Sequence, residues 1–171
     1  IYQAVFQSED EKVKALSTDP LTEALNSYKK ALELDIKNKF SNSLKIKLTL
    51  LNNDLQNQGV QAFSDENYVK ALDSFEKILK INHLPVLTAD GQANVDTAII
   101  YNSGLMALKI GDFDKAIRYY REAAQYDYNG AQSYMWLSRA YEEKKDTLGA
   151  LKSLKQGFEK YPSDNEFLRN M

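Results

Sequence analysis

The chain of 171 residues repeats part of its own sequence with a period of 34 residues. Small and aromatic residues recur in a fixed order, and Gly104, Ala116, Tyr120, Ala123 and Tyr128 return 34 positions later as Ser138, Ala150, Leu154, Gly157 and Pro162. The pattern also occurs upstream, offset by one period plus an insertion, as Leu55, Gly59, Ala71 and Phe75 and again as Ala24, Tyr28 and Ala31. A period of this length is typical of stacked supersecondary units, because a single unit leaves an apolar side uncovered. The repeat therefore predicts one solenoid domain.

Two glycines indicate where the two helices of a unit approach each other closely. Gly59 and Gly104 lie inside strongly helical segments, where glycine costs about 1 kcal/mol relative to alanine. A packing gain must offset this cost. We expect Ala71 and Ala116 to face these glycines across their hairpins, with the aromatic residue one turn further on filling the space beyond.

The clearest unit runs from Ala131 to Asp164 and carries Tyr134, Leu137, Ser138, Tyr141, Ala150, Leu154 and Pro162 at its repeating positions. It resembles the tetratricopeptide repeat family, in which each repeat is a pair of antiparallel helices. The units from Thr97 to Gly130 and from Asn52 to Pro85 follow the same pattern. Tryptophan is missing from its usual place in all of them, and only the last unit has its closing proline at the repeating position. The resemblance implies an all-α fold, a right-handed α-solenoid of about three full repeats plus a partial N-terminal one.

The resemblance also divides this single domain into consecutive segments. These are an irregular, partial first repeat (1–38), a repeat with an extended first helix (39–85), an insertion (86–96), two regular repeats (97–130 and 131–164) and the start of a C-terminal capping helix (165–171). The insertion contains the turn pair Asp90-Gly91 together with Val86, Leu87 and Val95, which suggest that it folds onto the solenoid. It either shapes one rim of the groove or fills a gap.

The first residues allow two interpretations. Ile1 and Tyr2 either end a first helix whose beginning is missing, with Gln7 to Pro20 as an insertion inside the hairpin, or residues 1–16 form one irregular capping helix. The sequence alone favours neither. Since the chain begins at Ile1 and not at Met, any leader would lie upstream.

An extended helix is expected between the first two hairpins. Between Asp35 and Asn52 the chain has about 13 residues more than the family pattern, and none of them is proline or glycine. One continuous apolar stripe runs through Leu44, Leu48, Leu51 and Leu55. The stripe predicts a helix from Phe40 to Phe63 that projects beyond its neighbours. We expect the projecting part to pack against Gln7 to Pro20; the alternative is a partner-binding prong. Six lysines in this region are interpreted as solvated helix faces, because Glu33 and Asp35 interrupt them.

In the resembling family, the first helix of each hairpin lines a concave face that holds an extended peptide. When the family's lining positions are carried over to this chain residue by residue, the resulting face is amide-rich at one end and apolar elsewhere. Such a face suits capture of a peptide backbone and its side chains. Trp136 lies close to this face and is either a binding anchor or a packing residue against the preceding hairpin. The eleven candidate residues, called the groove face below, are Asn53, Gln56, Val60, Phe63, Tyr101, Leu105, Leu108, Gln132, Met135, Trp136 and Arg139.

Chaperone-binding members of that family hold a C-terminal carboxylate with a clamp of Lys, Arg and Asn. Here the corresponding places hold Gln56, Val60, Asn102, Gln132 and Trp136, so that only the asparagine matches. We therefore expect no specific binding of the acidic C-terminal tails of cytosolic heat-shock chaperones.

Composition excludes several functional classes. The chain has no cysteine and one histidine, His83, which excludes thiolate chemistry, Cys-ligated metals and any two-histidine metal motif. We find no nucleophile elbow and no glycine-rich phosphate loop, and we expect neither an enzyme nor a cofactor. A net charge of −2 gives no general reason to bind nucleic acid or an anionic membrane, and no apolar run approaches the ~20 residues of a membrane span.

Two functional hypotheses remain. The first is an adaptor or scaffold that binds a peptide or partner protein in the concave groove. The second is a structural solenoid that self-associates through its repeat ends and its extended helix, giving a homo-oligomer. The irregular insertions and the Asn- and Tyr-rich composition look like those of exported bacterial repeat proteins, which leaves the compartment undetermined but favours a periplasmic or exported location.

Overall fold

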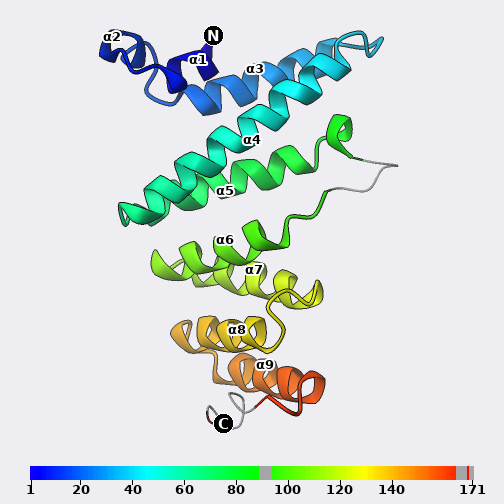
Figure 1. The fold of residues 1–171 in the computed structure, drawn as a ribbon. Helices are drawn as coiled ribbons and strands as arrows, with labels where there is room; N and C mark the ends of the chain where they lie inside the picture. Colours follow the sequence, from blue (N-terminus) through cyan, green and yellow to red (C-terminus); the bar gives the residue numbers. More distant parts are fainter. Residues whose placement is uncertain (89–93, 165–168, 170–171) are drawn as a thin grey trace.

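The computed structural model describes residues 1–88, 94–164 and 169, which form an elongated stack of helices (Figure 1). Within these residues every regular element is a helix, in agreement with the predicted all-α solenoid. The elements are α1 (Tyr2–Gln7), α2 (Glu11–Lys14), α3 (Pro20–Leu34), α4 (Ser41–Ser64), α5 (Tyr68–Asn82), the 3₁₀ helix η1 (Pro85–Leu87), α6 (Thr97–Lys109), α7 (Phe113–Gln125), α8 (Ala131–Glu143) and α9 (Thr147–Lys160).

Short polar side chains begin most of the long helices. Asp19, Asn67, Asp96, Asp112 and Asp146 each accept a hydrogen bond from a backbone N–H in the first turn of α3, α5, α6, α7 and α9. These caps satisfy backbone donors that have no partner inside the helix. Within the hairpins the chain reverses through residues with positive φ, namely Glu66, Gly111 and Lys145. Local sequence thus fixes where each hairpin turns.

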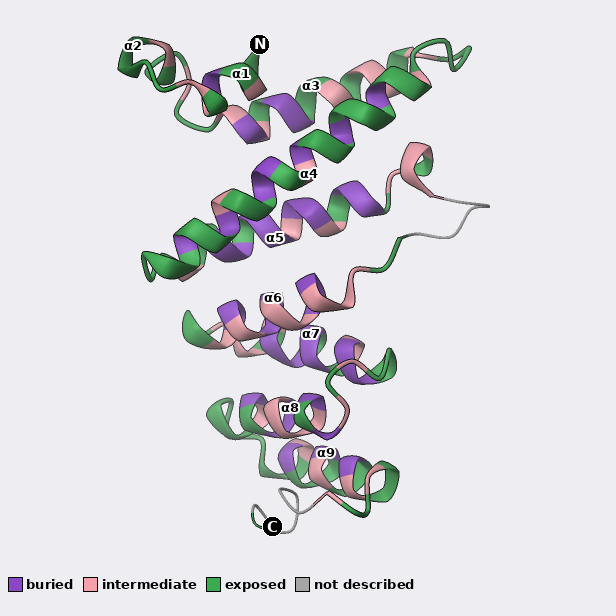
Figure 2. Cartoon of the chain, viewed as in Figure 1, coloured by how far each residue is buried: buried purple, intermediate pink, exposed green. Residues whose placement is uncertain are grey.

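Three antiparallel hairpins, α4/α5, α6/α7 and α8/α9, stack through α5 against α6 and α7 against α8. Every helix of these hairpins carries buried residues, coloured purple in Figure 2. Leu55, Phe75, Ile100 and Tyr120 belong to one continuous apolar core that extends through these layers. The core is therefore drawn out along the stack, as a solenoid requires.

The expected packing of alanine against glycine is wrong in detail. A Cβ atom added at Gly59 would lie 2.5 Å from Cε1 of Phe75, and one added at Gly104 would lie 3.1 Å from Cε1 of Tyr120. The nearest neighbours are thus the aromatic rings and not Ala71 or Ala116. Glycine is needed because a flat ring from the second helix rests directly on the backbone of the first.

The N-terminal region forms two short helices. A break over residues 8–10 separates α1 from α2, so the alternative of one irregular helix over 1–16 is wrong. α1 packs against α3, in the manner of the end of a first helix. The region's assignment as a partial repeat stays a prediction.

Helix α4 runs from Ser41 to Ser64, within one residue of its predicted bounds at both ends. Leu44, Leu48 and Leu51 are buried, and the helix beside this part of α4 is α3 (Figure 1). The expectation that the extension packs against Gln7 to Pro20 is therefore wrong. α3 takes this role because its own face, which includes Leu21 and Leu25, needs apolar cover.

The insertion after α5 begins with η1, whose Val86 and Leu87 pack against the core. The predicted turn at Asp90-Gly91 lies outside the described residues, and so does the predicted capping helix over 165–171 apart from Arg169. In the described ranges, none of the helices combines the length and apolar character needed to cross a membrane.

Candidate functional site

The groove face draws on the first helix of each hairpin. α4 carries Asn53, Gln56, Val60 and Phe63, α6 carries Tyr101, Leu105 and Leu108, and α8 carries Gln132, Met135, Trp136 and Arg139. The α4 side chains are exposed, whereas those on α6 are half-buried and pack against the core. The polar ends of the α8 set, Gln132 and Arg139, are exposed, and Met135 and Trp136 between them are half-buried. The face therefore combines a protruding amide and valine edge with a recessed apolar floor.

Four of these residues surround one hollow on α8. A cavity of about 280 Å³ is lined by Gln132, Met135, Trp136, Ser138, Arg139, Glu142 and Leu154. Met135 and Trp136 supply an apolar wall, and Gln132 and Arg139 supply hydrogen-bond donors at the rim. Leu154 comes from α9, which places the second helix of the last hairpin at the edge of the hollow. The hollow has the size and lining for a single apolar side chain with polar atoms beside it.

An aromatic cluster supports this hollow from behind. The indole of Trp136 stacks on the ring of Tyr120, with ring centroids 6.1 Å apart and planes 14° from parallel. Tyr101 meets Tyr120 edge-on at 5.4 Å and Tyr128 at 5.5 Å. Burial raises the pKa of Tyr120 well above its ordinary value, and burial also raises the pKa of Tyr101. The cluster therefore stays neutral and connects α6, α7 and α8 as packing.

The cluster limits what Trp136 and Tyr101 can do at a binding face. Trp136 packs on Tyr120 of the preceding hairpin, as one of its two interpretations proposed. The Tyr101 hydroxyl donates to Oε1 of Gln132 at 3.3 Å, so that it links α6 to the rim of the α8 hollow. Both side chains hold the face together, and Met135 is the freer group beside the hollow, since Gln132 already accepts the hydrogen bond from Tyr101.

At the other end of the face, Tyr68 at the start of α5 contacts side chains of both α4 and α6. The Phe63 ring lies 6.0 Å from that of Tyr68, and Nζ of Lys109 lies 5.7 Å above the Tyr68 ring. Val60 and Phe63 remain exposed beside these contacts. The groove face thus offers a second apolar area at this end.

The groove face is nearly free of net charge. Arg139 is its one charged residue, and its guanidinium pairs with Glu143 at 2.6 Å and with Glu142 at 3.6 Å. The remaining polar groups are the side-chain amides, the Tyr101 hydroxyl and the Trp136 indole N–H, all of them uncharged. Recognition on this face therefore depends on hydrogen bonds and apolar burial, and attraction between net charges contributes little.

A buried carboxylate that the sequence analysis did not identify lies on the other side of α4. Asp54 is buried and accepts hydrogen bonds from Nε2 of Gln3 at 2.6 Å and from Nε2 of Gln7 at 3.0 Å. The Tyr28 hydroxyl donates to Gln3, and burial, with the nearby charge of Asp54, raises the pKa of Tyr28. This network joins α1, α3 and α4, and we interpret it as structural.

A second unforeseen network joins α5 to α7. Glu76 accepts from Nζ of Lys115 at 2.8 Å and from the Tyr119 hydroxyl at 2.8 Å. Burial alone would raise the pKa of Glu76, but these hydrogen bonds and the Lys115 charge hold it below its ordinary value. The same residues line an open hollow of about 700 Å³ with Lys29, Lys80 and His83. It lies between the second helices of the hairpins, away from the groove face.

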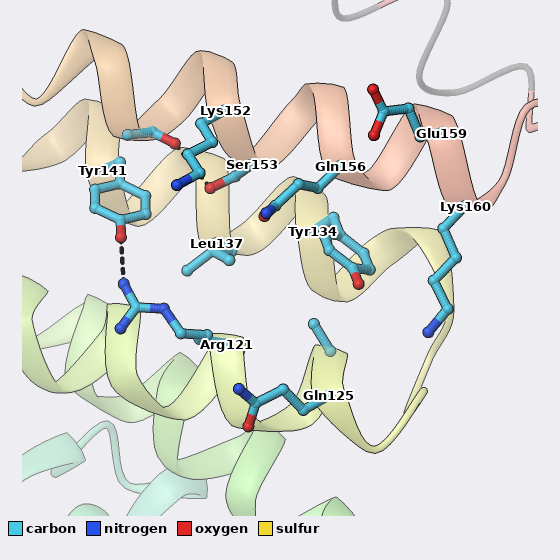
Figure 3. A pocket seen from close by; sticks show the side chains of 12 residues that line it. Arg121, Gln125, Tyr134, Leu137, Tyr141, Lys152, Ser153, Gln156, Glu159 and Lys160 are labelled. Atoms are coloured by element: carbon cyan, nitrogen blue, oxygen red, sulfur yellow. Dashed lines mark hydrogen bonds between the residues drawn. The ribbon is translucent and has the colours of Figure 1, made fainter.

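A third hollow, of about 640 Å³, lies among α7, α8 and α9 (Figure 3). Arg121 on α7 donates a hydrogen bond to the hydroxyl of Tyr141 on α8, which closes one end. The α9 wall carries Lys152, Ser153 and Gln156. Sequence reasoning did not identify this hollow, because its walls come from three helices whose facing sides only the stacking defines.

Metal binding has no support in the described part of the chain, where no group of three or more His, Asp or Glu residues is placed to hold an ion. His83 forms a local contact at the end of α5, with Nδ1 2.7 Å from the carbonyl oxygen of Leu79.

Comparison with known proteins places this geometry in context. Residues 101–169 match the tetratricopeptide repeat family. A search of curated proteins finds no significant match. The match covers α6 to α9, the part in which the 34-residue period is most regular. Tetratricopeptide repeats are in general interaction scaffolds without enzymatic activity.

Solved structures of repeat proteins share the fold. A TPR repeats protein from Bacteroides fragilis is 27% identical, with a TM-score of 0.58 over 68% of this chain and 47% of that one, so the chain spans about half of its length. A structure of MamA is 19% identical, with a TM-score of 0.53 over 96% of this chain and 83% of that one. MamA from Desulfovibrio magneticus is 14% identical, with a TM-score of 0.53 over 84% of this chain and 79% of its own.

Proposed function

We propose, from the premise that residues 101–169 belong to the tetratricopeptide repeat family, that this chain is a protein-interaction adaptor whose groove face binds an extended peptide or a segment of a partner protein. The observation that carries the proposal is the hollow on α8, where Met135, Gln132 and the neutralised Arg139 surround space for a side chain. Residues from three successive hairpins continue the same face. An extended ligand can therefore make similar contacts along the stack.

The chemistry of the face suits a largely uncharged ligand. Asn53, Gln56 and Gln132 each offer both a donor and an acceptor, which is what an extended backbone needs. Val60 and Met135 can bury apolar side chains of the ligand at separate points of the face. We therefore expect ligands with two apolar residues separated by an extended spacer.

The proposal is tested by selecting ligands from a random displayed peptide library and measuring their affinity for the full chain by calorimetry. The test variant is Val60→Glu, because Val60 is 54% exposed on α4 and its replacement leaves the core intact. The matched control is Val69→Glu, 66% exposed on α5. We expect at least about a tenfold loss of affinity for the first variant and little change for the second.

Met135→Glu tests the α8 end of the groove face in the same way, and we expect it to lower the affinity for the selected peptide as Val60→Glu does. Tyr101→Glu is a poor probe, since Tyr101 packs against Tyr120 and Tyr128 and its loss would damage the fold. Equal losses for Val60→Glu and Val69→Glu, or no selected peptide that binds the chain, would contradict groove binding.

Salt dependence gives an independent test. Because Arg139 is already paired with Glu142 and Glu143, raising the salt concentration from low to near-molar should change the affinity for a selected uncharged peptide by less than about threefold. A steep fall in affinity with salt would show that charge, not the apolar floor, drives recognition. The same titration with the acidic tail of a heat-shock chaperone should show no specific binding, since the carboxylate clamp is not matched.

The alternative function is self-association through the ends of the stack, and the exposed apolar residues of α9 favour it. Leu148 is 81% exposed and Leu151 is 60% exposed. Light scattering over a range of concentrations, with Leu151→Glu as the variant, distinguishes this function from the adaptor. A mass that rises with concentration and falls back in the variant would support assembly.

A further inference from the structure

The turn between α3 and α4 carries large apolar side chains that nothing in the described structure covers. Ile36 is 89% exposed, and Leu34, Phe40, Ile46 and Leu50 are each more than half exposed. These five residues, with the lysines between positions 29 and 47, are called the projecting tip below. Exposed apolar residues scattered singly are ordinary, but five within 17 positions around one turn are a local concentration that points to a function.

The projecting tip is strongly basic even though the whole chain has a net charge of −2. Positions 29–47 hold six lysines, Lys29, Lys30, Lys37, Lys39, Lys45 and Lys47, against two acids, a local net charge of +4. The overall charge therefore hides a concentrated positive area.

Both acids of the tip are engaged within it. The Glu33 carboxylate pairs with Lys30 at 3.1 Å. The Asp35 carboxylate accepts hydrogen bonds from the backbone N–H of Lys39 at 2.8 Å and of Phe40 at 2.7 Å. Among the described residues, no carboxylate lies within ion-pair distance of Lys37, Lys39 or Lys45. These ammonium groups are thus available to an external anionic surface.

The tip is a defined turn at the end of α3 and α4. The bonds to Asp35, with Asn38 in a left-handed conformation at φ 53°, fix the turn that presents Ile36. α4 has 24 residues and α5 has 15, and the tip lies at the far end of the longer helix (Figures 1 and 2). A protruding apolar turn does not form a pocket for a ligand. It suits insertion into a surface that can deform around it.

We infer that the projecting tip docks on an anionic lipid bilayer, with Ile36 and Phe40 entering the headgroup region and the surrounding lysines held by the negative surface. Apolar burial and attraction to anionic lipid each contribute to such peripheral binding, and the lysine stems can lie along the apolar boundary. The contact is peripheral and needs no spanning helix. Because the tip lies at the end of α3 and α4, binding of the tip to a bilayer would leave the groove face on α6 and α8 open to a partner.

The test uses flotation of the full chain with phosphatidylcholine vesicles and with vesicles of phosphatidylcholine mixed with phosphatidylserine. We expect binding to the mixed vesicles only, and weaker binding as salt is raised. Lys37→Glu with Lys39→Glu should reduce the partition coefficient by at least about twentyfold, since each lysine near an anionic surface changes it about fivefold. Ile36→Glu with Phe40→Glu should also remove binding.

The matched control is Leu16→Glu with Val69→Glu, which places the same two charges on exposed apolar side chains just after α2 and on α5, outside the tip. This variant should bind the mixed vesicles about half as well as the unchanged chain or better. Circular dichroism confirms that each variant remains folded. All four tip positions are exposed, so folding should be retained.

Three outcomes would overturn the inference. The folded, unchanged chain could fail to float with the mixed vesicles, or the control Leu16→Glu with Val69→Glu could lose binding as fully as the tip variants. The third outcome is that the tip binds a second copy of the chain or an acidic protein and does not bind lipid. In that case Ile36→Glu with Phe40→Glu would lower the mass seen by light scattering, or abolish capture of an acidic protein, while vesicles bind neither form.

Discussion

Gly59 lies where the ring of Phe75 rests on the backbone of α4. The closeness of this contact predicts the effect of adding one methyl group, as in Gly59→Ala. In an exposed helix, Gly→Ala adds about 1 kcal/mol of stability. Here the added Cβ would lie 2.5 Å from the Phe75 ring, which is itself buried. We expect Gly59→Ala to lower the free energy of unfolding by about 1–3 kcal/mol, measured by urea denaturation followed by circular dichroism.

Gly104 gives a graded comparison for the same substitution. Its added Cβ would lie 3.1 Å from the Tyr120 ring, so Gly104→Ala should destabilise less than Gly59→Ala. Combining Gly59→Ala with Phe75→Leu should recover part of the loss beyond additivity, because the two changes share one space. A gain in stability for Gly59→Ala would mean that the ring does not rest on the helix as described.

At the scale of helices, Glu76 links α5 to α7 and makes their contact sensitive to acid. Its folded pKa lies below its ordinary value, so its contribution to stability is present above the unfolded pKa and is lost as pH falls through the folded pKa. Glu76→Gln should lower stability by about 1 kcal/mol near neutral pH. The difference in Tm between the two proteins should shrink as the pH falls below about 4.

Two further variants show whether the Glu76 network, and not general surface charge, causes the dependence of stability on pH. Tyr119→Phe removes only the hydroxyl that donates to Glu76 and should cause a partial loss with the same dependence on pH. Glu159→Gln on α9 removes an exposed carboxylate 3.9 Å from Lys155 and should change Tm little at any pH. A Tm difference for Glu76→Gln that stays constant from neutral to acid pH would contradict the assignment.

Helices could be predicted closely where the signals are local, as in α4, whose stripe of leucines fixed both ends within one residue. Contacts between distant segments could not. The bond from Gln3 to Asp54 spans 51 positions and that from Tyr119 to Glu76 spans 43, and no local pattern indicates either pair. The same limit applies to the ring that faces Gly59.

The candidate site was predictable to a similar extent. The repeat register identified the α8 residues that line one hollow, namely Gln132, Met135, Trp136 and Arg139. It could not indicate that Glu142 and Glu143 neutralise Arg139, or that Trp136 stacks on Tyr120. It gave a partner-binding prong at the extended helix only as an alternative and interpreted the lysines there as solvated faces, because Asp35 reads as an interrupting surface charge until its bonds to the backbone are known. Whether the groove face binds a ligand stays a prediction.

For the molecule as a whole, the stack joins each helix from α3 to α9 to the next one along the chain. In such an arrangement stability is approximately a sum of unit and neighbour terms, so damage should spread little beyond its own hairpin. Leu137 on α8 and Leu55 on α4 are both buried, and truncating either to alanine should cost about 2–5 kcal/mol locally. The two variants should nevertheless weaken different parts of the molecule.

Hydrogen exchange measured by mass spectrometry on peptic fragments makes the distinction. We expect Leu137→Ala to speed exchange mainly in α8 and α9 and Leu55→Ala to speed it mainly in α3 to α5, each with smaller effects at the opposite end. Such a pattern would mean that the groove face can loosen at one hairpin while the projecting tip keeps its shape. If both variants sped exchange equally from α3 to α9, the chain would unfold as one cooperative unit, and binding at one end would be coupled to order at the other.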